Sequence, residues 1–234
     1  MKIAVLSDIH GNHFALKEVL RIAAIEHVDK LLILGDFVGY YYHPDKVLEM
    51  LSEWDHISIK GNHEKMLEHI ASGLIDELTS RKKYGSGHKL ALEKLSGKQL
   101  EWLNGLPEKL EIEIDKVRMQ MCHGSPLDPD QYLYPNTERG ILEKCDNAFC
   151  DFVFTGHSHY SFIYRNEKST LINVGSVGQS RSMGGLACWA IINTENKSFE
   201  MKTTPYDIRI LLTEIENTDP GVPYLKNVLL RNNH

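Results

Sequence analysis

The sequence predicts an α/β fold. Three observations lead to this prediction. Short apolar runs alternate with segments of helical periodicity over residues 3–60, helical segments follow one another over residues 64–105, and strand-like runs dominate beyond residue 111. With 234 residues the chain is long enough for one large core, and we expect a single domain over residues 1–234.

The first 60 residues predict a β-α-β-α-β unit. Residues 3–6 form a β-rich run, and residues 14–27 carry apolar side chains at helical spacing. Residues 31–34 are wholly apolar, as expected for a buried strand. Pro44 stands where the first turn of a second helix would accept it, and a third strand follows at residues 57–60. This order predicts a parallel sheet with right-handed crossovers.

The rest of the chain changes character twice. We expect residues 64–105 to form a helical insertion or cap beside the third strand. Candidate strands then follow at residues 117–121, 152–154, 162–164, 170–174, 187–192 and 199–203. A helix near residues 137–145 interrupts these strands, and residues 205–234 are expected to form a C-terminal helical segment.

The composition limits the classes of partner. The formal net charge is −6 and no dense stripe of Lys and Arg occurs, which argues against a nucleic acid polymer as partner. Two bound divalent cations would reverse the local field, so a small phosphorylated substrate is compatible with this charge. No apolar run approaches the roughly 20 residues of a membrane span. The four cysteines lack CxxC spacing, and we expect reduced thiols in a cytoplasmic protein: Cys122, Cys145, Cys150 and Cys188.

Five polar motifs stand directly behind five of the apolar runs. They read Asp8-Ile9-His10, Gly35-Asp36, Gly61-Asn62-His63-Glu64, Cys122-His123-Gly124 and Gly156-His157-Ser158-His159. Ligands of α/β sheets gather in the crevice outside the carboxyl ends of the strands, so motifs distant in sequence can meet there. One such residue after one strand means little, but their recurrence after five strands predicts a shared metal site. The predicted ligands are Asp8, His10, Asp36, Asn62, His123, His157 and His159.

This ligand set suits two divalent ions. Imidazole binds manganese, iron, zinc or nickel, and carboxylate and amide oxygens bind harder ions, so the identity of the metals stays open. Asp36 stands alone in its motif and can bridge two ions through its two carboxylate oxygens. Sites with two divalent ions hydrolyse phosphate esters.

The motifs resemble those of the calcineurin-like metallophosphoesterases over the span from Asp8 to His159. The resemblance implies a four-layer αββα sandwich of two mixed β-sheets flanked by helices, with a helical insertion. It also implies two groups of metal ligands that share Asp36. The first group would be Asp8, His10, Asp36 and His159, and the second Asp36, Asn62, His123 and His157.

Two further segments are similar to a branch of small bacterial and archaeal phosphodiesterases. They are the stretch from Asn173 to Arg181 and the Gly39-Tyr40 pair. Arg181 could hold a substrate phosphate through two N–H groups, or it could be a structural or solvent-exposed arginine. Tyr40 could stack on a base or line the cleft, or it could only pack its own loop.

His63 resembles the catalytic histidine of the family, because it directly follows the predicted ligand Asn62. In its cationic form it could protonate the departing alkoxide, with Glu64 or Asp8 orienting the ring through a hydrogen bond. In the alternative role, His63 only hydrogen-bonds the substrate or a metal ligand.

The leading hypothesis is a metal-dependent phosphoesterase, and within this class a phosphodiesterase for small or nucleotide-like substrates. A hydroxide that bridges two divalent ions would attack phosphorus in line with the leaving oxygen. The alternatives are a dinucleoside polyphosphate hydrolase, a protein phosphatase and a non-catalytic metal-binding scaffold. The scaffold is disfavoured because all seven predicted ligands and His63 are present.

Overall fold

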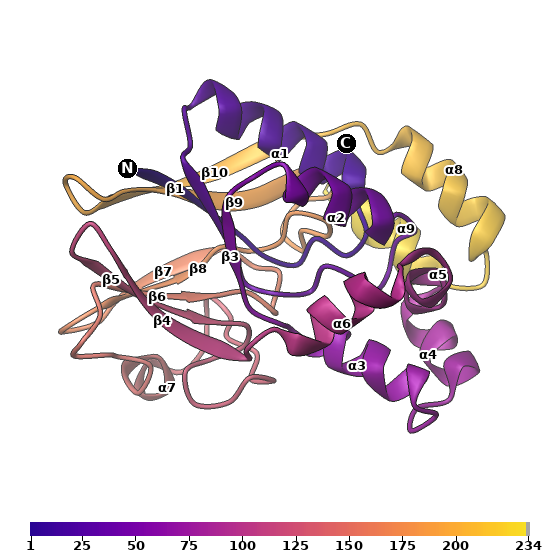
Figure 1. Cartoon of the computed structure of the whole chain (residues 1–234), viewed down its shortest axis with the longest axis horizontal. Helices are drawn as coiled ribbons and strands as arrows, with labels where there is room; N and C mark the ends of the chain where they lie inside the picture. The colour runs from indigo at the N-terminus through magenta and orange to yellow at the C-terminus, as the bar shows by residue number, and fades with distance from the viewer. Residues whose placement is uncertain (233–234) are drawn as a thin grey trace.

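Two mixed five-stranded sheets lie face to face, with helices outside them (Figure 1). This computed structural model describes residues 1–232 of the chain. The arrangement confirms the α/β fold of two mixed sheets flanked by helices. No helix within residues 1–232 is long and apolar enough to cross a bilayer.

The first sheet has the strand order β10-β9-β1-β2-β3. Its strands are β1 (Lys2–Leu6), β2 (Lys30–Ile33), β3 (His56–Ser58), β9 (Leu186–Asn193) and β10 (Ser198–Pro205). The strands β1, β2 and β3 run parallel, as predicted, and β9 pairs antiparallel with both β1 and β10. β3 ends two residues earlier than predicted, because the amide of Lys60 donates to the carbonyl of Pro107 (2.9 Å) instead of continuing the ladder.

The second sheet has the strand order β4-β5-β6-β8-β7. Its strands are β4 (Lys109–Ile114), β5 (Val117–Cys122), β6 (Phe152–Thr155), β7 (Phe162–Arg165) and β8 (Thr170–Asn173). β4 is absent from the candidate strands of the sequence. It is an edge strand with a charged residue at every second position, and only its alternate side chains contact the core between the sheets.

Alternation along the strands creates two apolar layers. Ile3 and Val5 of β1 belong to the core between the sheets, together with Met119 and Met121 of β5. Ala4, which lies between them, and Leu6 face the opposite side and pack under the outer helices. The sheets are thus fixed to each other along their length, which holds the carboxyl ends of β1, β2, β5 and β6 at one edge.

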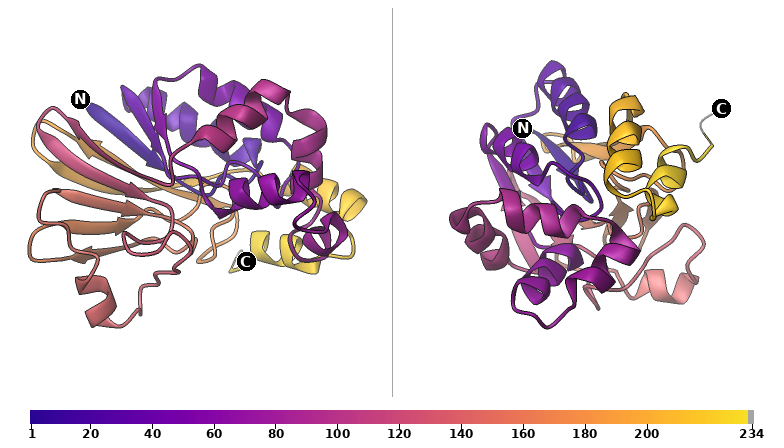
Figure 2. Two further views of the ribbon diagram at one scale, coloured as in Figure 1. Left: turned by 60° about the horizontal axis from the view of Figure 1, so that its bottom comes forward. Right: turned by 90° about the vertical axis from the view of Figure 1, so that its right-hand side faces the viewer.

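Helices cover the outer faces unequally (Figure 2). The outer core of the first sheet includes residues of α1 (His13–Ile25), α2 (Pro44–Ser52), α8 (Arg209–Thr218) and α9 (Pro223–Leu229). On the second sheet the covering layer is thin. Within residues 1–232 it has one short helix, α7 (Arg139–Glu143), whose Leu142 packs against Val153 and Leu171.

Four consecutive helices separate β3 from β4. They are α3 (Asn62–Ala71), α4 (Glu77–Tyr84), α5 (Gly87–Lys94) and α6 (Gly97–Gly105), and they lie together at one end of the sheets (Figure 1). The C-terminal helices contact this group. The carboxylate of Asp219, directly behind α8, accepts hydrogen bonds from the amide and the hydroxyl of Ser86, both at 2.7 Å. The last two residues of the expected segment 205–234 lie outside the described residues.

Candidate metal centre and adjoining cleft

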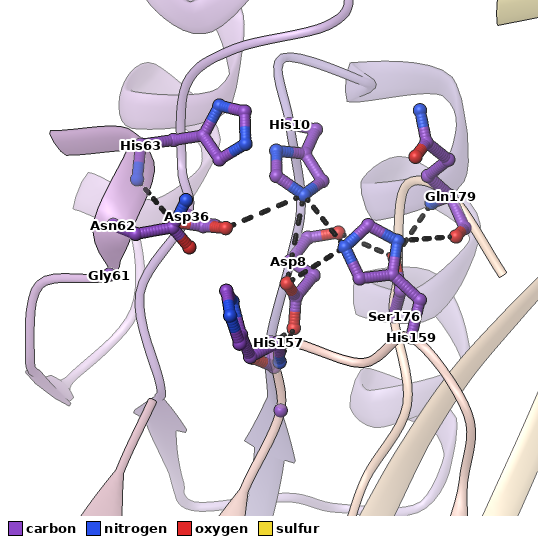
Figure 3. Close-up of polar contacts among 12 residues, drawn as sticks. Asp8, His10, Asp36, Gly61, Asn62, His63, His157, His159, Ser176 and Gln179 are labelled. Atoms are coloured by element: carbon purple, nitrogen blue, oxygen red, sulfur yellow. Dashed lines mark hydrogen bonds and ion pairs between the residues drawn. The ribbon is translucent and has the colours of Figure 1, made fainter. Parts of the chain in front are cut away.

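The motif residues meet at the edge formed by the carboxyl ends of the strands (Figure 3). Each predicted ligand stands in a loop directly behind a strand or, in the case of Asn62, at the start of α3. The structure brings all seven together, and six of them are buried: Asp8, His10, Asp36, His123, His157 and His159. Asn62 is partly exposed.

Five of these loop residues have a left-handed backbone conformation, which residues other than glycine rarely adopt. They are Asp8, His10, Asp36, His157 and His159, with φ between 52° and 62°. Close packing fixes the loops as well, since a Cβ atom on Gly156 would lie 2.0 Å from the hydroxyl of Ser7. Such strain persists where the surrounding structure imposes it, and it is commonly found at functional sites.

One group of ligand-type atoms belongs to residues of the loops that follow β1 and β6. Nε2 of His10 lies 3.2 Å from Nε2 of His159, and Oδ1 of Asp8 lies 3.1 Å from Nε2 of His159 and 3.6 Å from Nε2 of His10 (Figure 3). The other carboxylate oxygen of Asp8 is already occupied, because it accepts from the hydroxyl of Ser7 (2.6 Å) and the amide of His157 (2.9 Å). No group of residues 1–232 donates a hydrogen bond to Oδ1.

A second group gathers around Nε2 of His123. This nitrogen lies 3.0 Å from Oδ1 of Asn62, 3.1 Å from Nδ1 of His157 and 3.2 Å from Oδ2 of Asp36. The same oxygen of Asp36 lies 3.6 Å from Nε2 of His10 and so faces both groups.

The hydrogen bonds of three histidine rings show why these groups fit metal ions. Nδ1 of His10, His123 and His159 lies 2.7–2.9 Å from the backbone carbonyls of residues 38, 34 and 179, respectively. A carbonyl only accepts, so Nδ1 carries the proton and Nε2 of the neutral ring presents a lone pair. Lone pairs from imidazole, carboxylate and amide therefore point at one another, an arrangement that a cation stabilises.

The charges at the site also favour a cation. Burial by itself lowers the pKa of His123, but the carboxylate of Asp36 outweighs burial and raises this pKa to about 10. Burial would raise the pKa of Asp8, yet His159 and its other neighbours hold it well below its usual value. Burial would likewise raise the pKa of Asp36, but His123 and its other neighbours hold it low, so both carboxylates stay ionised. Without a metal, Nε2 of His123 therefore carries a proton in the place that a cation would take.

Glu64 braces two of the motif loops. Its carboxylate accepts hydrogen bonds from the amides of Asp36 (2.8 Å), Phe37 (2.9 Å), Val38 (3.3 Å) and Gly61 (2.8 Å). Burial and the charge of Asp36 raise its pKa to about 7, and the amides of Gly61 and Asp36 oppose this shift. The hypothesis that Glu64 orients the ring of His63 is therefore wrong, because its carboxylate is engaged by backbone amides.

The partner of His63 is a histidine outside the motifs. Nδ1 of His63 lies 3.1 Å from Nε2 of His88 on α5, and Nδ1 of His88 lies 3.2 Å from the hydroxyl of Ser80 on α4. The amide of His63 donates to Oδ1 of Asp36 (2.8 Å). His88 is buried, and no spacing in the sequence distinguishes it from a surface histidine.

These contacts leave Nε2 of His63 as the ring nitrogen available to a substrate. One ring nitrogen of His63 lies within 4.8 Å of ligand atoms of His10 and Asp36. Burial lowers the pKa of His63 well below its usual value and lowers that of His88 to about 4. A neutral His63 can still donate one N–H, provided that His88 donates to its Nδ1.

A cleft of about 560 Å³ adjoins the centre. Among residues 1–232, six tyrosines line it together with Lys83, Arg181 and Arg231. The ring of Tyr40 lies 4.6 Å from that of His10 between centroids, and Nε of Arg181 donates to the hydroxyl of Tyr224 (3.1 Å). The structure thus places both predicted substrate-binding residues, Tyr40 and Arg181, in this cleft.

A family profile described as the calcineurin-like phosphoesterase superfamily domain matches residues 1–197. The chain belongs to this superfamily. It is a metallophosphoesterase, a hydrolase that acts on phosphate esters, and this family membership implies divalent metal ions at the clustered His and Asp residues.

Three individual proteins align with most of the length of this phosphoesterase. It is 30% identical over 227 residues to an uncharacterised protein of Methanocaldococcus jannaschii, with 88% of each chain covered. The crystal structure of a metallophosphoesterase from Sphaerobacter thermophilus superimposes with a TM-score of 0.78, at 25% identity and 98% coverage of both chains. A hypothetical protein from Pyrococcus horikoshii OT3 shares the fold, with a TM-score of 0.82, 22% identity and coverage of 98% and 97%.

Replacing Glu64 by alanine is expected to destabilise the phosphoesterase by about 3–5 kcal/mol, because four buried or partly buried amides lose their acceptor together. Urea unfolding of the metal-free protein measures this change. Glu93→Ala removes an exposed carboxylate that pairs with Lys89 on the same helix, and it should leave stability nearly unchanged. Equal stability of the two variants would contradict the bracing role.

Replacing His88 by alanine is expected to slow the cleavage of esters with poor leaving groups by roughly 10- to 100-fold, because the ring of His63 loses its partner at Nδ1. His88→Gln offers an amide in a similar place and should recover part of this rate. Steady-state kinetics with an alkyl ester and a nitrophenyl ester separate this positioning effect from a general loss of structure, which would lower both rates alike.

Proposed function

We propose that this phosphoesterase holds two divalent ions and hydrolyses phosphodiesters of small, nucleotide-like substrates. The observation that carries the proposal is the convergence of imidazole nitrogens and carboxylate oxygens in two groups that share Oδ2 of Asp36. One ion would be held by Asp8, His10, Asp36 and His159. The other would be held by Asp36, Asn62, His123 and His157.

The geometry changes one detail expected from the sequence. Asp36 was expected to bridge through both oxygens, but its Oδ1 accepts the amide of His63 (2.8 Å). Oδ2 alone faces both groups, at 3.2 Å from His123 and 3.6 Å from His10. Asp36 would therefore contribute to both ligand groups through Oδ2. The mixed nitrogen and oxygen donors are compatible with manganese, iron, zinc or nickel.

Three side chains outside the ligand groups would bind the substrate and assist the leaving group. Two bound divalent ions supply Lewis acidity and an activated water. His63 would donate a hydrogen bond or a proton to the leaving oxygen through Nε2, with His88 holding the ring. Arg181 would neutralise a non-bridging phosphate oxygen, since within residues 1–232 it forms no ion pair and bonds through Nε to a neutral phenol. Tyr40 would line the floor of the cleft.

The decisive experiment is reconstitution of the metal-free protein with manganese, iron, zinc or nickel in turn. Bis(nitrophenyl) phosphate should then be hydrolysed faster than nitrophenyl phosphate, and chelation should abolish both activities. Cleavage of the monoester or of a phosphopeptide without the diester would favour a phosphatase. Preferential cleavage of a dinucleoside polyphosphate would favour that hydrolase. Bound metal without turnover of any of these esters would favour the non-catalytic scaffold.

A further inference from the structure

The cleft beside the metal centre is assembled from segments outside the five motifs. Lys83 and Tyr84 come from α4, Tyr132 from the loop behind β5, and Tyr224 and Arg231 from the C-terminal segment. It adjoins the predicted ligands directly, because the ring of Tyr132 stacks on His157 at 3.9 Å between centroids.

The cleft is cationic although the chain is acidic. Within residues 1–232 its lining contains no Asp or Glu. Arg231 donates to the carbonyl of Arg181 (2.8 Å) and the hydroxyl of Tyr160 (3.4 Å), and Nζ of Lys83 lies over the ring of Tyr84 at 4.9 Å. Within residues 1–232 no carboxylate pairs with Lys83, Arg181 or Arg231. Three cations gathered in one cleft, none of them paired with a carboxylate among the described residues, attract an anionic ligand.

The three cations differ in how closely they approach the predicted metal ligands. The amide of Arg181 donates to the carbonyl of His159 (3.2 Å), so Arg181 lies beside the centre. Arg231 reaches the cleft behind Arg181, and Lys83 approaches from α4. Neither of these two makes a polar contact with a predicted ligand within the described residues. A phosphate at the metals would meet Arg181 and would leave Lys83 and Arg231 for other negative charge.

The tyrosines also give the cleft aromatic surface, of which Tyr132 is the most exposed part. Tyr132 is 45% exposed although one side of its ring covers His157, and Tyr134 lies parallel to it at 7° and 5.9 Å. Aromatic side chains arranged along a cationic groove bind nucleobases by stacking, with little preference among bases.

We propose that this cleft binds a nucleoside that carries at least two phosphates. One phosphate would lie at the metal centre beside Arg181, a further phosphate would be held by Lys83 and Arg231, and the base would stack on the tyrosines. The proposal rests on the proposed function, because it assumes that a phosphate occupies the metal centre.

Calorimetric titration of the manganese-loaded protein tests the proposal with two probes, AMP and the α,β-methylene analogue of ADP. The analogue should bind roughly tenfold more tightly than AMP, because charge-assisted hydrogen bonds reach its second phosphate. Arg231→Gln and Lys83→Gln should each reduce this advantage severalfold while changing the affinity for AMP much less. Lys83 is exposed and donates no hydrogen bond within the described residues, so its variant tests the idea even if Arg231→Gln impairs folding.

Arg118→Gln is the matched control. Arg118 is exposed, pairs with Glu113 and lies near the amino end of β5, whereas His123 follows the carboxyl end. The Arg118→Gln variant should keep the wild-type affinities for AMP and for the analogue. Equal affinity for AMP and the analogue, or an advantage that survives both variants, would overturn the proposal. Failure to hydrolyse bis(nitrophenyl) phosphate would instead overturn the proposed function, and the binding comparison would still be decisive for the cleft.

Discussion

Replacing Asp36 by asparagine is expected to lower phosphoesterase activity by at least about a thousandfold and to lower the metal content with it. Oδ2 of Asp36 is the atom that faces both ligand groups, at 3.2 Å from His123 and 3.6 Å from His10. The amide oxygen of asparagine can still accept the hydrogen bond from His63, so its NH2 group must take the place of Oδ2. A donor without negative charge would then stand where two cations are proposed to share an anion.

Metal analysis by mass spectrometry and steady-state kinetics on the same preparations check this result. Asp207→Asn is a suitable control, because Asp207 is exposed, pairs with Arg209 and belongs to neither ligand group. The control should keep wild-type metal content and activity. Full activity of Asp36→Asn with two bound ions would refute the bridging assignment.

Replacing His63 by alanine should produce a loss that depends on the leaving group. Esters with poor leaving groups, such as alkoxides, should be cleaved about 10²- to 10⁴-fold more slowly, because they need a proton or a strong hydrogen bond as the bond to phosphorus breaks. A nitrophenolate leaves without this help and should be released at nearly the normal rate. The ring is well placed for this role, since His88 holds its Nδ1 and leaves Nε2 to the substrate.

The comparison of two esters tests the role and not only the importance of His63. Rates for a nitrophenyl and an alkyl diester, measured with the same metal-loaded variant, give the ratio directly. An equal loss on both esters would mean that His63 only positions substrate or metal ligands. The hydrogen bond from His63 to Asp36 comes from the backbone amide of His63, so it survives the loss of the His63 side chain.

The predicted ligands could be found from the sequence because each follows a strand. Asp8 and His123 are 115 positions apart, yet β1 and β5 end at the same edge once the sheets face each other. Strand order along the chain and a polar motif behind each run were sufficient for this prediction. β4 was missed because an alternating edge strand with three charged residues gives a weak apolar signal.

The supporting residues could not be found in this way. His88 sits on α5 and has no recurring neighbour, and its contact with His63 depends on how α5 packs against α3. Glu64 was recognised as part of a motif, but its four amide donors appear only when the loops behind β2 and β3 are folded together.

The amino-acid sequence by itself determined the α/β class, the parallel N-terminal strands and the identity of the residues that gather at one edge, because periodicity and strand ends are local properties of the chain. Only the tertiary structure decided which oxygen of Asp36 faces both ligand groups, which residue contacts the ring of His63, and that tyrosines and cations line one cleft. Those features depend on distances between side chains of separate elements. Such distances follow from the packing of helices and loops on the sheets and leave no regular spacing in the sequence.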